Sequence, residues 1–288
     1  MTIATDSKQY NTHANLLHQV SMSSFYKMET NKLLGAERTC IMRLTLDTLT
    51  TEHITVSETN MKMGCTFSFS TPSVKSCPKG VPCFKACYAR AFEEKRGTVH
   101  LSYVNNMNQM LNHPKEVEDR ICGCINGFGT KFFRFNVSGD VCVDPLRPYL
   151  YIDLIRNCSM RCKACKFLVF TKCDLWNNVD IERNLNVMYS YWLDWKVNNP
   201  KGFRATNVIK KPKKNDPIPT DLFICPNCLD KRIQCSDCHH CWGIPEFDYW
   251  KAKGIEMPDK VKEYYKNRDV KDMSITHFFA HGIHKNKL

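Results

Sequence analysis

Three apolar runs follow one another between residues 131 and 192: KFFRFNV (131–137), KFLVFTK (166–172) and NLNVMYSYW (184–192). Each run has the length and composition of a β-strand. The segment between the first two runs, DPLRPYLYIDLIRNCSMR, is predicted to be helical. A strand–helix–strand order of this kind indicates a parallel sheet or a barrel. The expected fold is therefore of the α/β class.

The apolar pattern continues toward the N-terminus. TFSFSTP, residues 66–72, is predicted to be a strand that enters a loop at Pro72. Residues 86–126 carry apolar side chains at helical spacing and are predicted to form two or three helices. Farther upstream, alternation in RLTLDTLTTEHITV, residues 43–56, indicates strands around a turn.

Composition divides the chain into four expected segments. Residues 1–63 form an N-terminal extension, residues 64–206 a barrel-like α/β core, and residues 221–288 a cysteine-rich metal-binding region. Residues 207–220 join the last two and hold four lysines and three prolines, which predicts an exposed basic linker.

The bulk composition is that of a basic globular protein. The chain has 288 residues, 43% of them hydrophobic, and a net charge of 41 − 29 = +12. The charge favours an anionic partner such as nucleic acid, a nucleotide-like cofactor or an acidic protein; a basic surface without a specific partner is the alternative. The sequence shows neither an apolar run of membrane-spanning length nor a secretory signal, so we expect a reducing cytoplasm and no membrane.

The 17 cysteines are the main indication of function. Disulfides are rare in a reducing compartment, and an odd number of cysteines cannot be fully paired within one chain. Tightly spaced cysteines in such a compartment more often bind metal. Three groups of them stand out.

The first group is CPKGVPCFKAC, which places Cys77, Cys83 and Cys87 on a Pro/Gly loop leading into a predicted helix. Thiolates suit soft metals and iron–sulfur clusters, and a helix start favours an anionic cluster. Three protein ligands would leave one metal position open for a substrate. Zinc with a fourth ligand from elsewhere, or buried thiols without metal, are the alternatives.

The last group is the densest, with five cysteines and two adjacent histidines within 17 residues: Cys225, Cys228, Cys235, Cys238 and Cys241. Paired C-x2-C motifs are typical of zinc ribbons, in which four thiolates close the site. C-x2-C-x2-C is also an iron–sulfur spacing. Metal binding is expected here, with the metal left open.

The middle group is Cys158, Cys162 and Cys165, in the C-x3-C-x2-C spacing of radical S-adenosylmethionine enzymes. That motif normally opens a barrel, whereas here it falls late in the chain, at the end of the predicted helix. A third, accessory metal site or free thiols are therefore the alternatives to a catalytic cluster.

One polar segment ends a predicted strand: Arg134, Asn136, Ser138, Gly139 and Asp140. A glycine at a strand end lets the backbone approach a ligand closely, and an adjacent carboxylate accepts hydrogen bonds from an ammonium group. We predict a cofactor-binding segment, with an ordinary strand-end turn as the alternative.

The order of these motifs is similar to that of the phage-borne gene-product-eighty-eight family, over roughly residues 64–245. That family in turn resembles, distantly, radical S-adenosylmethionine barrels of the spore-photoproduct-lyase type. The resemblance implies an incomplete, partial TIM-like barrel of the radical-enzyme type with Cys77, Cys83 and Cys87 at its mouth. It also implies a terminal metal site formed by Cys225, Cys235, Cys238 and Cys241.

In the same resemblance, Ser138, Gly139 and Asp140 correspond to the Gly-Gly-Glu segment that holds the ammonium of S-adenosylmethionine. The chain departs from the radical-enzyme pattern, because its first spacing is C-x5-C-x3-C and Asp replaces Glu. Seven cysteines lie outside the family pattern: Cys122, Cys124, Cys142, Cys158, Cys162, Cys165 and Cys173.

The leading hypothesis is a phage iron–sulfur enzyme in the host cytoplasm, with one or two 4Fe-4S clusters, S-adenosylmethionine as a candidate cofactor, and a peptide or nucleic acid as substrate. The alternative is a non-catalytic, zinc-stabilised protein that binds nucleic acid or a host partner. It would use Lys210, Lys211, Lys213 and Lys214 with a zinc-bound C-terminal region to contact phosphates.

Overall fold

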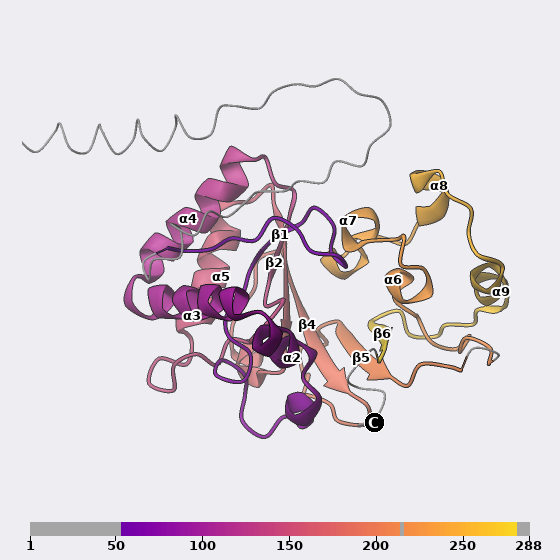
Figure 1. The fold of residues 1–288 in the computed structure, drawn as a ribbon, viewed down its shortest axis with the longest axis horizontal. Helices are drawn as coiled ribbons and strands as arrows, with labels where there is room; N and C mark the ends of the chain where they lie inside the picture. The colour runs from indigo at the N-terminus through magenta and orange to yellow at the C-terminus, as the bar shows by residue number, and fades with distance from the viewer. Residues whose placement is uncertain (1–52, 214–215, 281–288) are drawn as a thin grey trace, which may run out of the picture. The chain divides into compact units, whose positions relative to one another are not determined.

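The computed structural model describes residues 53–213 and 216–280, all within the compact unit Met42–Leu288. Six parallel strands form one sheet in chain order (Figure 1): β1 (Phe67–Phe69), β2 (Phe132–Phe135), β3 (Lys166–Thr171), β4 (Leu185–Trp192), β5 (Ala205–Ile209) and β6 (Ile275–Phe279). The four strands predicted around residues 66–72, 131–137, 166–172 and 184–192 are confirmed. The α/β class is confirmed as well, whereas a barrel stays a prediction.

Helices lie in every connection between strands except the one from β4 to β5. They are η2 (Pro82–Ala86), α2 (Tyr88–Lys95), α3 (Gly97–Asn112), α4 (Pro114–Gly127), α5 (Leu150–Arg161), η3 (Asp174–Asn178), α6 (Pro226–Leu229), α7 (Cys235–Cys238), η4 (His240–Trp242), α8 (Tyr249–Lys253) and α9 (Asp259–Asn267). The helices predicted within residues 86–126 are therefore three. None of the helices in the described ranges is long and apolar enough to cross a membrane.

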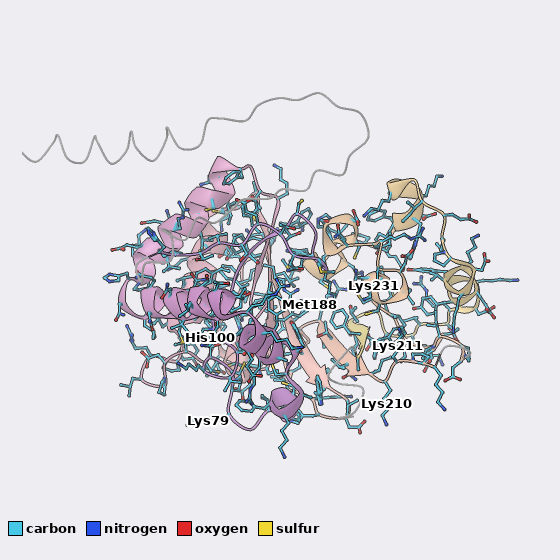
Figure 2. The ribbon with its side chains drawn as sticks, in the orientation of Figure 1. Lys79, His100, Met188, Lys210, Lys211 and Lys231 are labelled. Atoms are coloured by element: carbon cyan, nitrogen blue, oxygen red, sulfur yellow. The ribbon has the colours of Figure 1, made fainter. Side chains whose placement is uncertain are left out.

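The expected segment boundaries cut across the sheet. β5 continues to Ile209, beyond the expected end of the core at residue 206, and β6 comes from the cysteine-rich region. Between them, residues 210–213 have no regular structure, and Lys213 is exposed. Lys210 and Lys211 are exposed as well (Figure 2). Lys214 and most of the segment 43–56 lie outside the described residues.

The cysteine-rich region packs on one face of the sheet. Leu168 of β3 and Met188 of β4 are buried there against Trp242. The indole nitrogen of Trp242 donates a hydrogen bond of 3.0 Å to the Phe133 carbonyl, and the His239 ring stacks on Phe132 with centroids 3.6 Å apart. Figure 1 shows α6 to α9 on the opposite side of the sheet from α3 to α5.

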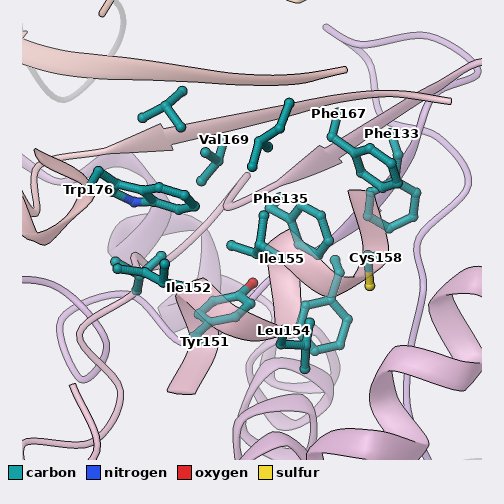
Figure 3. Packing of buried hydrophobic residues seen from close by; sticks show 14 of the residues in the cluster. Phe133, Phe135, Tyr151, Ile152, Leu154, Ile155, Cys158, Phe167, Val169 and Trp176 are labelled. Atoms are coloured by element: carbon teal, nitrogen blue, oxygen red, sulfur yellow. The ribbon is translucent and has the colours of Figure 1, made fainter. Parts of the chain in front are cut away.

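The main core lies on the helix-covered face (Figure 3). Strand side chains alternate between faces, so Phe133, Phe135, Phe167 and Val169 all point toward α5. They pack against buried α5 side chains, which are Tyr151, Ile152, Leu154 and Ile155.

Because all strands are parallel, their carboxyl ends share one edge, and the loops after β1, β2 and β3 meet there.

Candidate metal centre

The first cysteine group forms the loop that follows β1 at the carboxyl edge of the sheet. Cys77 lies in a bend of the loop, and Cys83 lies within η2. Cys87 is the residue before α2, where its sulfur accepts a hydrogen bond of 3.5 Å from the Arg90 amide. All three thiols are partly exposed, as ligands of an accessible metal must be.

A buried serine fastens the start of this loop to the strand ends. The Ser76 hydroxyl donates to the Pro72 carbonyl over 2.7 Å and accepts from the Thr71 hydroxyl over 2.9 Å. It also accepts from the Asp140 amide over 3.0 Å, which joins the loops after β1 and β2. The residue preceding Cys77 is therefore fixed by three partners.

Glu93 of α2 also holds the cysteine loop in place. Its carboxylate is 4% exposed and accepts hydrogen bonds from the Ser73 amide, over 3.0 Å, and from the Ser138 hydroxyl. His100 Nδ1 lies 2.9 Å from the other carboxylate oxygen. Glu93 is not among the predicted site residues, because a glutamate on an amphipathic helix usually faces solvent. It connects the cysteine loop with the predicted cofactor-binding segment.

The thiols of the loop share one electrostatic environment. Burial raises the pKa of Cys77 to about 12, and the charges of Asp140 and Cys87 add to the shift. Burial also raises the pKa of Cys83, while the Lys172 ammonium opposes the shift. Since the thiolate is the metal-binding form, metal must displace protons from these thiols. Lys172 was not among the predicted site residues, although its place directly after β3 is visible in the sequence.

The predicted cofactor-binding segment forms a tight turn after β2. One oxygen of Asp140 accepts from the Thr171 hydroxyl and the Val141 amide, and the other accepts from the Lys172 amide, over 2.6 to 2.7 Å. Gly139 has a φ of +77°. The alternative interpretation, a strand-end turn, describes these contacts. Ligand binding by Ser138, Gly139 and Asp140 stays a prediction.

Arg134 and Asn136 lie on the face of the sheet that the cysteine-rich region covers. The Arg134 guanidinium is 4.4 Å from the centre of the Phe170 ring, and its Nη1 is 3.5 Å from the Met63 sulfur. Arg134 Nε and Asn136 Oδ1 are buried and have no hydrogen-bond partner among residues 53–213 and 216–280. Unpaired buried polar atoms are rare, so this position retains binding capacity that the protein itself does not use.

The last cysteine group is brought together by short helices. Cys225 precedes α6 and Cys228 lies within it, and the Cys228 amide donates a hydrogen bond of 2.7 Å to the Cys225 carbonyl. Cys235 and Cys238 are the ends of α7, and Cys241 lies in η4. Burial raises the pKa of Cys241 to about 11, with the Cys235 charge contributing. Trp242 packs beside Cys235 and Cys241 against the sheet.

Lys62 is an unpredicted neighbour of this group. Its carbonyl accepts a hydrogen bond of 3.0 Å from the Cys235 amide. Burial alone would lower the pKa of the Lys62 ammonium, but the charges of Cys225, Cys228 and Cys235 raise it above its ordinary value. Lys62 lies in the segment that was expected to be an N-terminal extension. It is far from Cys235 in the sequence, so no local sequence pattern could predict this contact.

The middle group occupies the opposite edge of the sheet. Cys158 lies in the last turn of α5, Cys162 follows that helix, and Cys165 immediately precedes β3. These thiols are therefore remote from the loop after β1. Cys122 of α4 is buried in the same core cluster as Cys158, Cys162 and Cys165.

All three cysteine groups would offer thiolates as metal ligands. Thiolates suit zinc or iron–sulfur clusters rather than hard cations. Among residues 53–213 and 216–280, no three His, Cys, Asp or Glu side chains are arranged to hold a single metal ion. A four-iron cluster binds each thiolate at a different iron, so its ligands do not converge on one point. The partly exposed loop of Cys77, Cys83 and Cys87 is compatible with that requirement.

Comparison with known proteins identifies one family. No curated protein and no solved structure matches the chain, and no comparison supports similarity to radical S-adenosylmethionine enzymes. The sequence model of the Gene product 88 family matches residues 40–244, from the segment before β1 to the last cysteine group. This span covers most of the chain and agrees with the resemblance drawn from the order of its motifs. The chain therefore belongs to the Gene product 88 family.

Proposed function

We propose that the protein is an iron–sulfur enzyme in which Cys77, Cys83 and Cys87 bind a 4Fe-4S cluster with one open iron. The observation that carries the proposal is the position of the loop. Its three partly exposed thiols follow β1 at the carboxyl edge of a parallel sheet. The loops that follow β2 and β3 begin at the same edge. Ligand sites of parallel α/β proteins lie at this edge.

The sequential order of six parallel strands supports the finer proposal of a radical-enzyme-type partial barrel. A reduced cluster of this kind supplies one electron to a cofactor bound at its open iron, and S-adenosylmethionine is the candidate. The protein's own residues hold the loop rigid through Ser76 and Glu93. Lys172 places a positive charge near the thiolates. The proposed substrate is a peptide or a nucleic acid.

Anaerobic purification followed by iron and sulfide analysis tests the cluster. We expect Cys83→Ala to lose one cluster's share of iron and the matching visible absorption, while its urea unfolding curve stays close to that of the parent. Cys65→Ala is the matched control, because Cys65 is an exposed free thiol outside the loop. Full iron content in Cys83→Ala would show that the loop does not bind the cluster.

The last cysteine group has two proposed occupants. Cys225, Cys235, Cys238 and Cys241, with Cys228 as a spare ligand, can hold a second 4Fe-4S cluster or a zinc ion. The interactions among these thiols and the shielding by Trp242 support a closed site with a structural or electron-relaying role. Metal analysis of the same preparations distinguishes the two occupants.

A second candidate function is non-catalytic nucleic-acid binding, and the exposed lysines after β5 favour it. Replacing Lys210, Lys211 and Lys213 by Gln should weaken duplex DNA binding. It should also flatten the slope of log K against log salt by about 0.9 for each phosphate that the variant no longer neutralises. The control replaces three other exposed lysines, Lys251, Lys266 and Lys271. An equal effect of both triple variants would exclude a specific role for the segment.

A further inference from the structure

Two cations lie over a pair of aromatic rings on the sheet face that the cysteine-rich region covers. Arg134 of β2 is 9% exposed, and its guanidinium carbon is 4.4 Å from the centre of the Phe170 ring of β3. The Lys62 ammonium nitrogen is 4.1 Å from the centre of the Phe278 ring of β6. The two rings contact each other edge to face, with centroids 6.3 Å apart. Each cation therefore lies over one ring of the same aromatic pair.

These contacts require the sheet to curve around the two cations. Two strands separate β3 from β6, so their axes would lie about 14 Å apart in a flat sheet. Phe170 and Phe278 nevertheless touch. Lys62 reaches Phe278, and the next residue, Met63, has its sulfur 3.5 Å from Arg134 Nη1. The contacts thus form a closed circle, which makes the two cations parts of one site.

Neither cation is balanced by a carboxylate. Among residues 53–213 and 216–280, the ion pairs include neither Arg134 nor Lys62. In the same part of the chain, Arg134 Nε is buried without a hydrogen-bond partner. An aromatic ring attracts a cation but carries no net charge, and a buried charge without a counter-charge is costly. An anionic ligand would supply the missing negative charge.

Two neutral groups on this face also lack hydrogen-bond partners within the described ranges. They are Asn136 Oδ1, two residues beyond Arg134, and Thr276 Oγ1, two residues before Phe278. Asn136 Nδ2 already donates to the Phe170 carbonyl over 3.5 Å, so the oxygen is the available end of this amide. An amide oxygen only accepts, which suits a hydroxyl group of a ligand. The unpaired groups therefore match a molecule that carries both an anionic group and hydroxyl groups.

We propose that Arg134 and Lys62 bind the phosphate of a small phosphomonoester, and that Asn136 Oδ1 accepts a hydrogen bond from a hydroxyl of the same molecule. A phosphomonoester carries about −1.5 to −2 charges at neutral pH and so balances both cations. A carboxylate would leave one cation uncompensated. Arginine also matches the geometry of phosphate through paired N–H donors. The site uses none of the cysteine thiols, so the proposal does not depend on a metal cluster.

Isothermal titration calorimetry of the full-length protein tests the site with three ligands: ribose 5-phosphate, inorganic phosphate and acetate. We expect one ribose 5-phosphate per chain, weaker binding of inorganic phosphate, and acetate binding about tenfold weaker still. Arg134→Gln and Lys62→Gln should each weaken the binding of ribose 5-phosphate about tenfold or more, because each removes a charge-assisted contact. The matched controls, Arg120→Gln and Lys271→Gln, each remove one exposed positive charge and should keep the parent affinity.

Urea unfolding with and without ribose 5-phosphate is the second measurement, and it also reports whether each variant folds. The ligand should raise the parent midpoint, because it binds the folded state, and should leave the midpoint of each site variant unchanged. Lys62 is only half-buried, so Lys62→Gln tests the site even if Arg134→Gln does not fold. Cys83→Ala should keep the parent affinity, which separates this proposal from that of the iron–sulfur cluster.

Three results would overturn the proposal. The first is a parent protein that binds neither phosphate ligand saturably, and the second is an equal loss of affinity in the control variants. The third is loss of iron or zinc from Arg134→Gln or Lys62→Gln with unchanged phosphate affinity, because the cations would then balance the thiolates of the last cysteine group. Equal affinity for ribose 5-phosphate and inorganic phosphate would overturn the role of Asn136 and the phosphomonoester as ligand.

Discussion

Gly139 is the residue at which the turn after β2 passes closest to the cysteine loop. A Cβ atom there would lie 2.3 Å from the Thr71 hydroxyl, 2.4 Å from the Ser76 hydroxyl and 2.6 Å from the Thr71 carbonyl oxygen. Its φ of +77° is also strained for any residue with a Cβ. The close approach predicted for a ligand at this glycine is made in the structure by the protein's own loop.

Gly139→Ala should therefore lower the free energy of unfolding. We expect a loss of about 1–2 kcal/mol for the positive φ and a further loss of about 1–3 kcal/mol for the crowding. Gly129→Ala is the matched control, because Gly129 has a φ of +60° and no atom within 4 Å of the added Cβ. Urea unfolding of both variants measures the difference. Equal losses would mean that the loop moves aside without an energetic penalty.

At the scale of elements, Asn184 connects the end of α5 with the start of β4. Its side-chain amide donates to the Ser159 carbonyl, in the last turn of α5 where a helix leaves its carbonyls unpaired, and to the Cys162 carbonyl, which also accepts from the Cys165 amide. The same amide also sets the position of Cys165 before β3. A single side chain thus holds the connection between the helix layer and the sheet.

Asn184→Ala should cost about 1–3 kcal/mol, because buried carbonyls lose their donor. Hydrogen exchange should increase in residues 159–167 before it increases elsewhere. Asn112→Ala is the control, since the exposed Asn112 side chain donates to the Asn108 carbonyl of its own helix. Uniform exchange in the Asn184 variant would contradict this role.

At the scale of the whole molecule, Trp242 attaches the cysteine-rich region to the sheet. The side chain is 1% exposed and packs on Leu168 and Met188, two residues of neighbouring strands. Beyond it, the region has a small core of its own that includes Tyr249, Trp250 and Val261. The region therefore combines local packing with one large anchor.

Trp242→Ala should lower the free energy of unfolding by about 3–5 kcal/mol, the usual cost of removing a buried aromatic side chain. Protease cleavage should begin within residues 221–245, because the variant lacks the indole that packs this segment against the sheet. Phe247→Ala is the control for removing an aromatic side chain from the same region, since Phe247 is 42% exposed. If cleavage began elsewhere, side chains other than Trp242 would hold the cysteine-rich region on the sheet.

Local patterns were sufficient to predict β1 to β4 and the three helices after β1, because each element carries its apolar residues within one short window. They failed for β5 and β6. ATNVI is short and adjoins the lysine segment, and ITHFF is isolated near the C-terminus. Neither strand can be predicted from its own residues. Each becomes evident only in the structure, where β6 pairs with β5 across more than sixty residues of intervening chain.

The sequence by itself determined the α/β class, the family and the three cysteine groups, because these depend on residue types at short spacing. Only the tertiary structure decided which groups meet. It packed Cys122 into one core cluster with Cys158 and Cys162, brought Lys62 to the last cysteine group, and placed Glu93 between the loops after β1 and β2. Such contacts arise when parallel strands align at a common edge, and no local spacing encodes that alignment.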